Sequence, residues 1–501
     1  MLQVGYVLVI ITIVVVATSI VYPDRLVGTK GRPDLPGPPG IPLLGNLLQL
    51  LPHRKQMLLH LSVLEKKYGE LFSFTMPGWG RTIVINRPEW LEHVRQQDGV
   101  GYGKGDFTLA IFREFPGAES AFGSEGSKWK TARKIMRPVF SSRAVDLHTY
   151  HAMNKIIPIA KEMLMSAANS HLIFDFNNFC GRLTLAIFCE MALNVETGIL
   201  TSDPSCLTTP HGLMDAVTTL NRISSGRMYN PFWRITDMID GTRKTFNDAH
   251  KRIYGLIEQL IQNRRKDLSN SDSEGDFLST LLCDSGVAAS VLTRDTLVTL
   301  LFAGRDTTQN AIVWSLFELS RATEWIDKMR VEASAYQGII PYDKMADYPI
   351  HLAVFHETLR LWPGVPKNAR LALRDDILPG IPDCGGKTIP ISKGDYVLWS
   401  DYAMMRNPKV WGTDSEIFNP GRHLDADGLF VKPSSPKFHA FGGGPRLCPG
   451  AKIAAYEFVA TWAGLLPLFD FIPLEVKDRL PTDALTMEME GSFMIRVLPR
   501  E

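Results

Sequence analysis

The chain lacks the cysteine patterns of zinc-binding and disulfide-rich proteins. Its 501 residues include six cysteines, and no two of them form a Cys-x-x-Cys pair. A zinc ribbon or a disulfide framework is therefore not expected, and the pattern favours a reducing compartment. The chain also lacks an excess of charge of either sign, since its formal net charge is +1. This balance gives no indication of nucleic-acid binding.

The chain has no sequence signature for a nucleotide or flavin site of its own. No Gly-x-Gly-x-x-Gly stretch opens a predicted helix, and no flavin domain is appended. If the protein catalyses a reaction that needs electrons, these must come from a separate protein.

Charge is absent from the beginning of the chain. No charged residue precedes Asp24, and Val4 to Tyr22 form one continuous uncharged segment. As a helix this segment would span roughly 28 Å, close to the hydrocarbon thickness of a bilayer. A cleaved signal peptide would carry Lys or Arg before the apolar run, and a buried core helix would have a polar face. The segment therefore predicts a single transmembrane anchor over residues 1–23.

Residues 24–45 form a basic, proline-rich segment behind the predicted anchor. Arg25, Lys30 and Arg32 lie in it, and by the positive-inside rule they leave the bulk of the chain in the cytosol. The run Pro-Gly-Pro-Pro-Gly follows at 36–40, where proline fixes the backbone and removes N–H donors. This composition predicts a stiff hinge, with a generic linker as the alternative.

The segment from Phe438 to Ala451 carries the strongest chemical signal. Cys448 lies there among glycine and proline, and Arg446 lies two residues before it. Backbone N–H groups of such a loop can stabilise a thiolate, and the arginine can offer a forked donor to an anionic group. This combination suits a single thiolate ligand to a metal that carries its own anionic periphery, as haem does. The alternative is a buried free cysteine in a glycine-rich turn.

This loop resembles the haem-binding loop of the cytochromes P-450. Their pattern Phe-x-x-Gly-x-Arg-x-Cys-x-Gly is matched by Phe441, Gly444, Arg446, Cys448 and Gly450. The resemblance implies a haem b cofactor, with Cys448 as the iron ligand and with Phe441 and Arg446 at the cofactor.

Three further residues resemble cofactor contacts of that family. Trp129 and Arg133 are four apart in a predicted helix, so they share a face, and both side chains only donate hydrogen bonds. They match the family's Trp-x-x-x-Arg contact to a haem propionate. By the same resemblance, Arg370 would contact a propionate and Val365 would contact the substrate.

A long helix is predicted from Thr293 to Arg321, and it contains residues that a helix interior disfavours. Gly304 and the pair Thr307-Thr308 both reduce helix propensity, which often marks a functional site. The stretch from Ala303 resembles the family's Ala/Gly-Gly-x-Asp/Glu-Thr motif. The resemblance implies a catalytic role for Asp306 and Thr307 in proton delivery and places Ala303 in the substrate pocket. The alternative is a helix with a back-bonded threonine and a surface aspartate.

A structural ion cluster is predicted before the cysteine loop. Glu357 and Arg360 are three apart on one predicted helix and can pair. The resemblance adds Arg422, from the family's Phe-x-Pro-x-Arg motif, which starts here at Phe418. His423 occupies a position where the family usually has an aromatic residue.

The last candidates are residues predicted to line the substrate pocket and three isolated histidines. The aromatic stretch from Asp106 to Phe122 would line the pocket by resemblance, through Phe107 and Phe112, with a plain core-packing loop as the alternative. Phe493 lies at a predicted hairpin tip that reaches the pocket in the family. The remaining histidines considered, His356, His423 and His439, are isolated in sequence and are expected to be hydrogen-bonded structural residues rather than metal ligands.

The family resemblance covers nearly the whole chain and implies a fold that is mostly α with small β-sheets. Residues 46–501 would form a haem-thiolate catalytic domain, anchored as a single-pass protein in the endoplasmic reticulum membrane. The implied activity is insertion of one oxygen atom into a lipophilic substrate such as a fatty acid, terpenoid or steroid. Electrons would come from NADPH–cytochrome P-450 reductase, with cytochrome b5 as a second candidate donor. The alternatives are a haem-thiolate isomerase or dehydratase and a non-catalytic haem-binding protein.

Overall fold

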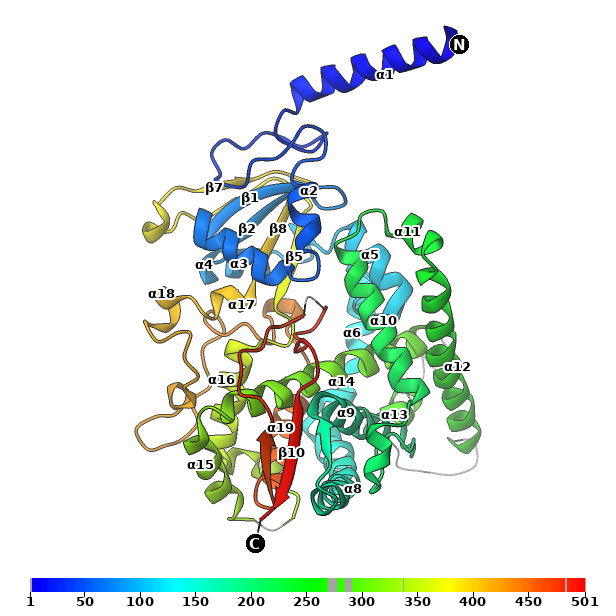
Figure 1. Cartoon of the computed structure of the whole chain (residues 1–501), viewed down its shortest axis with the longest axis vertical. Coiled ribbons are helices and arrows are strands. Elements are labelled where there is room, and N and C mark those ends of the chain that lie inside the picture. The colour runs from blue at the N-terminus through cyan, green and yellow to red at the C-terminus, as the bar shows by residue number, and fades with distance from the viewer. Residues whose placement is uncertain (1, 269–276, 284–290, 337, 483, 501) are drawn as a thin grey trace.

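The computed structural model describes residues 2–268, 277–283, 291–336, 338–482 and 484–500. Packed helices make up most of the body, and a small β-rich layer lies at the end from which α1 (Leu2–Val21) projects (Figure 1). The prediction of a mostly α fold with small sheets is confirmed.

The longer helices form most of the body of the molecule. They are α3 (Met57–Tyr68), α4 (Pro88–Gln96), α5 (Asp106–Phe112), α6 (Gly126–Met136), α8 (Tyr150–Asn169), α9 (Phe176–Leu193), α10 (Gly212–Met228), α11 (Trp233–Ile239), α12 (Thr242–Leu268), α13 (Phe277–Cys283), α14 (Val291–Leu319), α15 (Thr323–Ala333), α16 (Pro349–Leu361) and α19 (Ala451–Leu465). The shorter ones are α2 (Leu47–Leu50), α7 (Ser142–Ala144), α17 (Asp401–Met404) and α18 (Pro408–Trp411).

The strands form three small sheets within the described residues. They are β1 (Leu71–Met76), β2 (Gly80–Ile85), β3 (Tyr102–Gly103), β4 (Ile173–Asp175), β5 (Lys367–Ala372), β6 (Asp376–Leu378), β7 (Ile389–Ile391), β8 (Tyr396–Ser400), β9 (Phe469–Pro473) and β10 (Met494–Pro499). The largest sheet has the order β1-β2-β8-β5-β3, in which β2 and β8 are parallel and pair Thr82 with Tyr396. This sheet brings β5 and β8, from the C-terminal third of the chain, beside strands from its N-terminal part.

Helix α14 is the central element of the body. It packs against α9, α12, α16 and α19, and most of its side chains are buried (Figure 1). Because neighbours cover it on several sides, polar residues in its sequence face other helices or a cavity rather than solvent. The helix was predicted from Thr293 to Arg321 and begins and ends two residues earlier.

The proline-rich segment lies along the edge of the largest sheet. The Ser73 N–H donates to the Pro36 carbonyl at 2.8 Å, and Asn46 Nδ2 donates to the Pro38 carbonyl at 3.0 Å. A Cβ at Gly37 would lie 2.0 Å from the Ser73 carbonyl oxygen, so only glycine allows this approach. The segment is therefore fixed to β1 over this part of its length.

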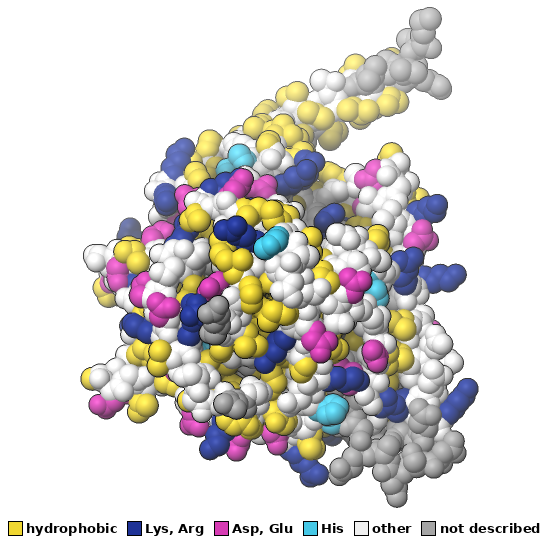
Figure 2. All heavy atoms as spheres, turned by 60° about the horizontal axis from the view of Figure 1, so that its bottom comes forward, with side chains coloured by type: hydrophobic (Ala, Val, Ile, Leu, Met, Phe, Trp, Pro, Cys, Tyr) yellow, Lys and Arg dark blue, Asp and Glu magenta, His cyan; other side chains and the backbone are white. Residues whose placement is uncertain are grey.

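Helix α1 covers most of the predicted anchor. Its described side chains are largely hydrophobic and exposed, as the projecting helix in Figure 2 shows. Across the described ranges, no helix meets the combined requirement of length and apolar character for crossing a membrane. The transmembrane anchor therefore remains a prediction.

Candidate functional site

A cavity of about 480 Å³ lies beside the middle of α14. Its walls come from α6, α10, α14, β5, the loop before α19, and α19 itself. Most of the residues predicted for the cofactor and the substrate line this single cavity: Phe112, Trp129, Arg133, Ala303, Thr307, Val365, Arg370, Phe441, Arg446 and Cys448.

The loop before α19 presents Cys448 to the cavity. The Cys448 N–H donates to the Phe441 carbonyl at 2.9 Å, which closes the loop. Gly444 has a φ of +61°, and a Cβ there would lie 3.1 Å from the Arg95 carbonyl oxygen, so the turn requires glycine. Cys448 keeps accessible surface because it opens onto the cavity, although the surrounding protein shields its sulfur from bulk solvent.

Two opposing influences act on the Cys448 thiol. Burial raises its pKa, while the backbone N–H groups of Gly450 and Ala451 and the charge of Arg133 act in the opposite direction. These N–H groups lie at the start of α19, where a helix favours negative charge. Burial has the larger effect, so the pKa of the Cys448 thiol is raised overall in the protein alone. The N–H groups reduce this rise, and they would support the thiolate, the form of cysteine that binds a metal, when a cation lies beside it.

Basic and donor side chains gather along one edge of the cavity. Arg446 donates from Nε to Asp98 at 2.8 Å, also pairs with Glu125, and lies 4.6 Å from the centre of the Trp129 ring. Arg133 donates to the Leu447 carbonyl at 2.7 Å, next to Cys448. Arg370 lies on the other side of Asp98, to which it donates from Nε at 2.9 Å.

One donor at this edge tests whether haem fits. Arg446 Nη1 is buried and has no hydrogen-bond partner among the described residues. A buried guanidinium N–H is costly to leave unpaired, so this position suits an anionic group. Haem supplies two propionates and an axial position for one sulfur, so the donor set and Cys448 fit it.

The two predicted catalytic residues occupy different environments although they are adjacent on α14. Thr307 lines the cavity, and its hydroxyl donates to the Ala303 carbonyl at 2.7 Å. Asp306 is not among the lining residues and is 2% exposed. Its carboxylate accepts from Arg305 Nη1 at 2.7 Å and from Asn221 of α10 through a short hydrogen bond. Asp306 is thus buried against α10, neither on the surface nor in the cavity.

A second acid, which the sequence reasoning missed, does line the cavity. Glu457 lies on α19 and is 5% exposed. Burial raises its pKa to about 8, against a smaller opposite effect of a hydrogen bond with Thr308. The side chain is therefore largely protonated at neutral pH. The signal in the sequence is one acidic residue among the mostly apolar residues of the helix that follows the cysteine loop.

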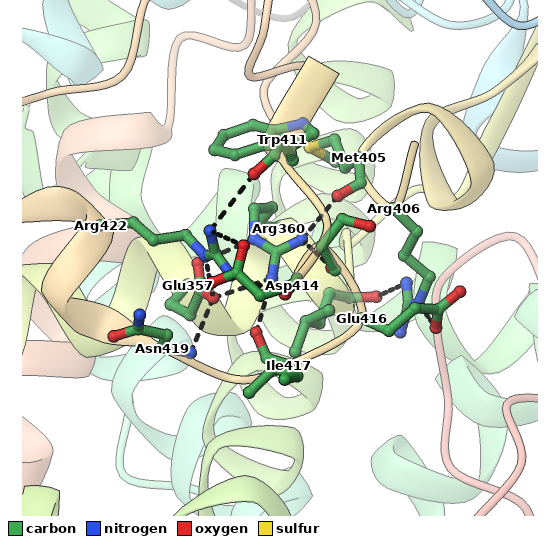
Figure 3. Close-up of polar contacts among 12 residues, drawn as sticks. Glu357, Arg360, Met405, Arg406, Trp411, Asp414, Glu416, Ile417, Asn419 and Arg422 are labelled. Atoms are coloured by element: carbon green, nitrogen blue, oxygen red, sulfur yellow. Dashed lines mark hydrogen bonds and ion pairs between the residues drawn. The ribbon is translucent and has the colours of Figure 1, made fainter. Parts of the chain in front are cut away.

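The predicted ion cluster of Glu357, Arg360 and Arg422 forms in the structure (Figure 3). Arg360 donates from Nε and Nη2 to the two oxygens of Glu357, each at 2.8 Å, and both side chains are fully buried. Arg422 Nε lies 3.4 Å from Glu357 Oε1, and its other nitrogens bind Asp414 and the Trp411 carbonyl. Arg360 also donates to the carbonyls of Met405, Ser415 and Ile417, so the cluster holds the segment before the cysteine loop.

The third partner of Glu357 is His423, which was expected to be a hydrogen-bonded structural residue. Its Nε2 lies 3.0 Å from Glu357 Oε2. Burial alone would raise the pKa of Glu357, but the hydrogen bonds from Arg360 and His423 outweigh burial and lower that pKa to about 2. The other two isolated histidines are also hydrogen-bonded, His356 to the Leu352 carbonyl and His439 to Arg95. The described residues contain no cluster of His, Cys, Asp and Glu that could hold a metal ion.

Two residues predicted for the substrate pocket are not among those that line the cavity. Phe107 packs against Trp79, with 5.7 Å between the ring centres. Phe493 is 1% exposed and packs near Phe176, because its backbone pairs with Phe176 and with the Asp175 side chain. The cavity wall near the C-terminus comes instead from Ala484, Leu485 and Thr486.

Comparisons with known proteins agree with this arrangement. The family model described as Cytochrome P450 matches residues 35–496. A protein of Mycosarcoma maydis named Cytochrome P450 monooxygenase cyp1 is 32% identical over 90% of this chain and 71% of its own length. Cytochrome P450 94A2 of Vicia sativa is 26% identical over 94% of both chains, and Cytochrome P450 94B1 of Arabidopsis thaliana is 26% identical over 93% of this chain and 91% of its own. The chain therefore belongs to the cytochrome P450 family and is a haem-thiolate monooxygenase.

Proposed function

We propose that this monooxygenase inserts one oxygen atom of O2 into a C–H bond or a double bond of a lipophilic small molecule, with electrons from a separate NADPH-dependent reductase. The observation that carries the proposal is that Cys448 and Thr307 line the same cavity. A thiolate that could bind iron and a hydroxyl that could deliver a proton therefore face the same cavity.

One group of cavity residues would bind the cofactor, and another would deliver protons. Cys448 would be the residue that binds the iron of haem b, and a haem bound through a thiolate would supply oxygen activation. Trp129, Arg133, Arg370 and Arg446 would hold the propionates, and Phe441, within the cysteine loop, would contact the cofactor. These roles are supported by the shared cavity edge and by the unpaired Nη1 of Arg446.

Proton delivery would pass through the two adjacent residues of α14. Thr307 presents the hydroxyl that faces the cavity, and we assign it the last transfer. Asp306 would supply protons to Thr307. Its carboxylate is held by Asn221 of α10 and by the neighbouring Arg305 of α14. This transfer requires Asp306 to leave at least one of these contacts, or a water molecule to bridge the gap.

The walls of the cavity support a lipophilic substrate such as a fatty acid, terpenoid or steroid. Besides Phe112 and Val365, they include Trp79, Phe122 and Leu485. Aromatic and aliphatic side chains stabilise a bound ligand by burying its apolar surface. The positions of Phe107 and Phe493 give them at most an indirect influence on this substrate, through the residues they support.

The electron donor would dock near the cysteine loop. Arg133 reaches the Leu447 carbonyl from α6, so this helix lies beside Cys448, and Lys130 and Lys134 on it are exposed. Exposed lysines suit an acidic partner surface, as expected of NADPH–cytochrome P-450 reductase, with cytochrome b5 as a second candidate.

We also propose that residues 1–23 attach the protein to the endoplasmic reticulum membrane, with residues 24–45 as the hinge and residues 46–501 as the cytosolic catalytic domain. The support is the series of exposed apolar side chains on α1, such as Tyr6, Ile10 and Ile13. Exposed apolar surface of this extent is unfavourable in water.

A ligand-binding spectrum tests the proposed cofactor chemistry. The purified, reduced holoprotein is exposed to carbon monoxide, and we expect the red-shifted absorbance that thiolate ligation produces. Cys448→Ser is expected to abolish this band, whereas Cys189→Ser, at a buried cysteine that is not among the cavity-lining residues, is expected to retain it. Retention of the band by Cys448→Ser would refute the assignment of the ligand.

A further inference from the structure

A histidine that the proposed cofactor site does not use lies in the same cavity. His439 precedes Cys448 by nine residues, is 2% exposed, and is among the residues that line the cavity. Its Nδ1 lies 3.1 Å from Nη1 of Arg95, which is buried near the end of α4. One ring nitrogen is therefore occupied by a residue outside the cysteine loop.

The contact with Arg95 determines which ring nitrogen carries the proton. A guanidinium only donates hydrogen bonds, so Nδ1 of His439 must accept. Burial, with a smaller effect of the Arg95 charge, lowers the pKa of His439 to about 3, so the ring is neutral at physiological pH. In a neutral ring whose Nδ1 accepts, the proton lies on Nε2. This tautomer follows from the hydrogen-bond partner.

The resulting Nε2–H donor has no partner. Nε2 is buried, and no hydrogen-bond acceptor is found for it within the described part of the chain. An unpaired buried donor is costly, so a native site normally pairs it with protein, water or a ligand. Because Nδ1 is taken by Arg95, Nε2 is the polar atom that His439 can offer to the cavity.

The charges around His439 indicate what it faces. Arg95 is close enough to Asp401 and Arg370 for both to act on its pKa. Asp401 is buried, lines the same cavity, and has its pKa raised to about 7 by burial, against smaller opposite effects that include the charge of Arg95. Arg370 is one of the basic residues assigned above to a propionate. His439 therefore lies at the edge of the cavity where the carboxylates of the cofactor would lie.

We propose that Nε2–H of His439 is a hydrogen-bond donor to a propionate of the bound haem, and that Arg95 is the positioning residue that fixes the donor tautomer. This inference rests on the proposed cofactor site. A neutral donor adds a hydrogen bond without adding a further positive charge beside Arg95, Arg370 and Arg446. Like charges repel more strongly in a buried site than in water, so a neutral imidazole is the more favourable donor there.

Haem transfer tests the proposal without relying on turnover. Holoprotein is mixed with an excess of an apoprotein that binds free haem tightly, and the rate of haem loss is followed by absorbance. His439→Phe keeps an aromatic ring without a donor, and we expect haem loss about tenfold faster or more, since a hydrogen bond to a charged group is lost. His439→Gln retains an N–H donor and is expected to stay within about threefold of the wild type.

A modified cofactor separates hydrogen bonding from packing. Each protein is also loaded with haem dimethyl ester, in which the propionates carry no charge. There the ratio between His439→Phe and wild type is expected to fall to less than about threefold, because the charged acceptor is absent. Equal acceleration with both cofactors would overturn the proposal, and so would unchanged haem loss in His439→Phe.

Further variants complete the design. His356→Phe alters another buried histidine, which is not among the cavity-lining residues, and it is expected to leave haem loss unchanged. Arg95→Lys retains a donor for Nδ1 and is expected to resemble wild type, whereas Arg95→Met is expected to accelerate haem loss. If Arg95→Met has no effect, the positioning role is wrong. Failure of the wild type itself to bind haem would instead contradict the proposed function.

Discussion

Asn221 of α10 donates a hydrogen bond to the carboxylate of Asp306 on α14, so the acid next to Thr307 is tied to a neighbouring helix. That helix also contributes Ser225 and Met228 to the wall of the cavity. The position of the acid is therefore coupled to a wall that the substrate would touch.

The first prediction concerns this acid. Asp306→Asn cannot supply a proton, and we expect product formation to fall by about 10²-fold, in the range of losses seen when a general acid is removed. The solvent deuterium effect on turnover should change with it. Asn221→Ala removes a contact but keeps the acid, so a smaller loss is expected. An equal loss in both variants would mean that the contact, and not the acid, matters.

The second prediction concerns the hydroxyl in the cavity. Thr307→Ala removes a hydroxyl that the Ala303 carbonyl holds in place. We expect NADPH oxidation to continue while several-fold more of the electrons end in hydrogen peroxide, because proton delivery loses its last donor. Product and peroxide are measured together against NADPH consumed. Thr307→Ser should restore most of the product, and unchanged coupling in Thr307→Ala would favour an isomerase or dehydratase.

Local motifs were predictable from the sequence because their geometry is local. Glu357 and Arg360 are three residues apart on one helix, so their contact follows from helix geometry. The turn that presents Cys448 is likewise specified within a few residues, by a carbonyl of the same loop and by glycine at Gly444. In these cases the sequence contains both partners within one element.

Contacts between distant elements were not predictable in the same way. Asp306 was identified, but its direction depends on Asn221, which is 85 residues away and carries no signal of its own. Glu457 becomes notable only because α19 packs against α14. Phe493 was placed in the pocket by family resemblance, whereas its backbone pairs with Phe176 and its side chain packs in the core. Side-chain direction at such positions is set by tertiary packing.

The third prediction concerns His423 and the stability of the buried cluster. His423→Phe introduces the aromatic side chain that is common in the family at this position, but it removes one hydrogen bond to Glu357. We expect a loss of about 1.5–3 kcal/mol in the free energy of unfolding, as for other hydrogen bonds to charged groups. Urea unfolding of the holoprotein at neutral pH measures it.

The same cluster has a defined dependence on pH. Because the pKa of Glu357 is lowered to about 2, its carboxylate stabilises the fold above its ordinary pKa of 4.5. That contribution is lost as pH falls from about 4.5 towards 2. Loss of a hydrogen bond from His423 lets this pKa rise, so the acid transition of His423→Phe should begin at a higher pH. An unchanged acid midpoint would contradict the assigned contact.

The fourth prediction concerns the electron donor. Lys134→Glu reverses an exposed charge on α6, the helix that contacts the cysteine loop through Arg133. Association with an acidic partner should slow by several-fold at low salt, and the difference should shrink at high salt because the charges are screened. Stopped-flow reduction by the reductase measures the rate. Lys251→Glu, on α12, is the matched surface control, and equal slowing in both variants would argue against docking at α6.

The fifth prediction follows from the raised pKa of Glu457. Burial holds this pKa near 8, while the unfolded chain has the ordinary value of 4.5. Between these values the folded protein keeps a proton that the unfolded chain has lost, so the free energy of unfolding falls as pH rises and levels off above about 8. Glu457→Gln cannot ionise and keeps an oxygen for Thr308, so it should be stabilised relative to wild type by an amount that grows with pH.

Urea unfolding at several pH values measures this difference. At most about 1.4 kcal/mol accrues per pH unit, so the gap should widen by roughly 2 kcal/mol between pH 6 and pH 7.5. Glu196→Gln removes an exposed carboxylate and serves as the control, with a gap that stays nearly constant. A gap for Glu457→Gln that did not depend on pH would show that the carboxyl is not held protonated. In that case a hydrated Glu457 would have to be considered as a proton donor in its own right, because an ionised acid on the cavity wall requires water or a partner to offset its burial.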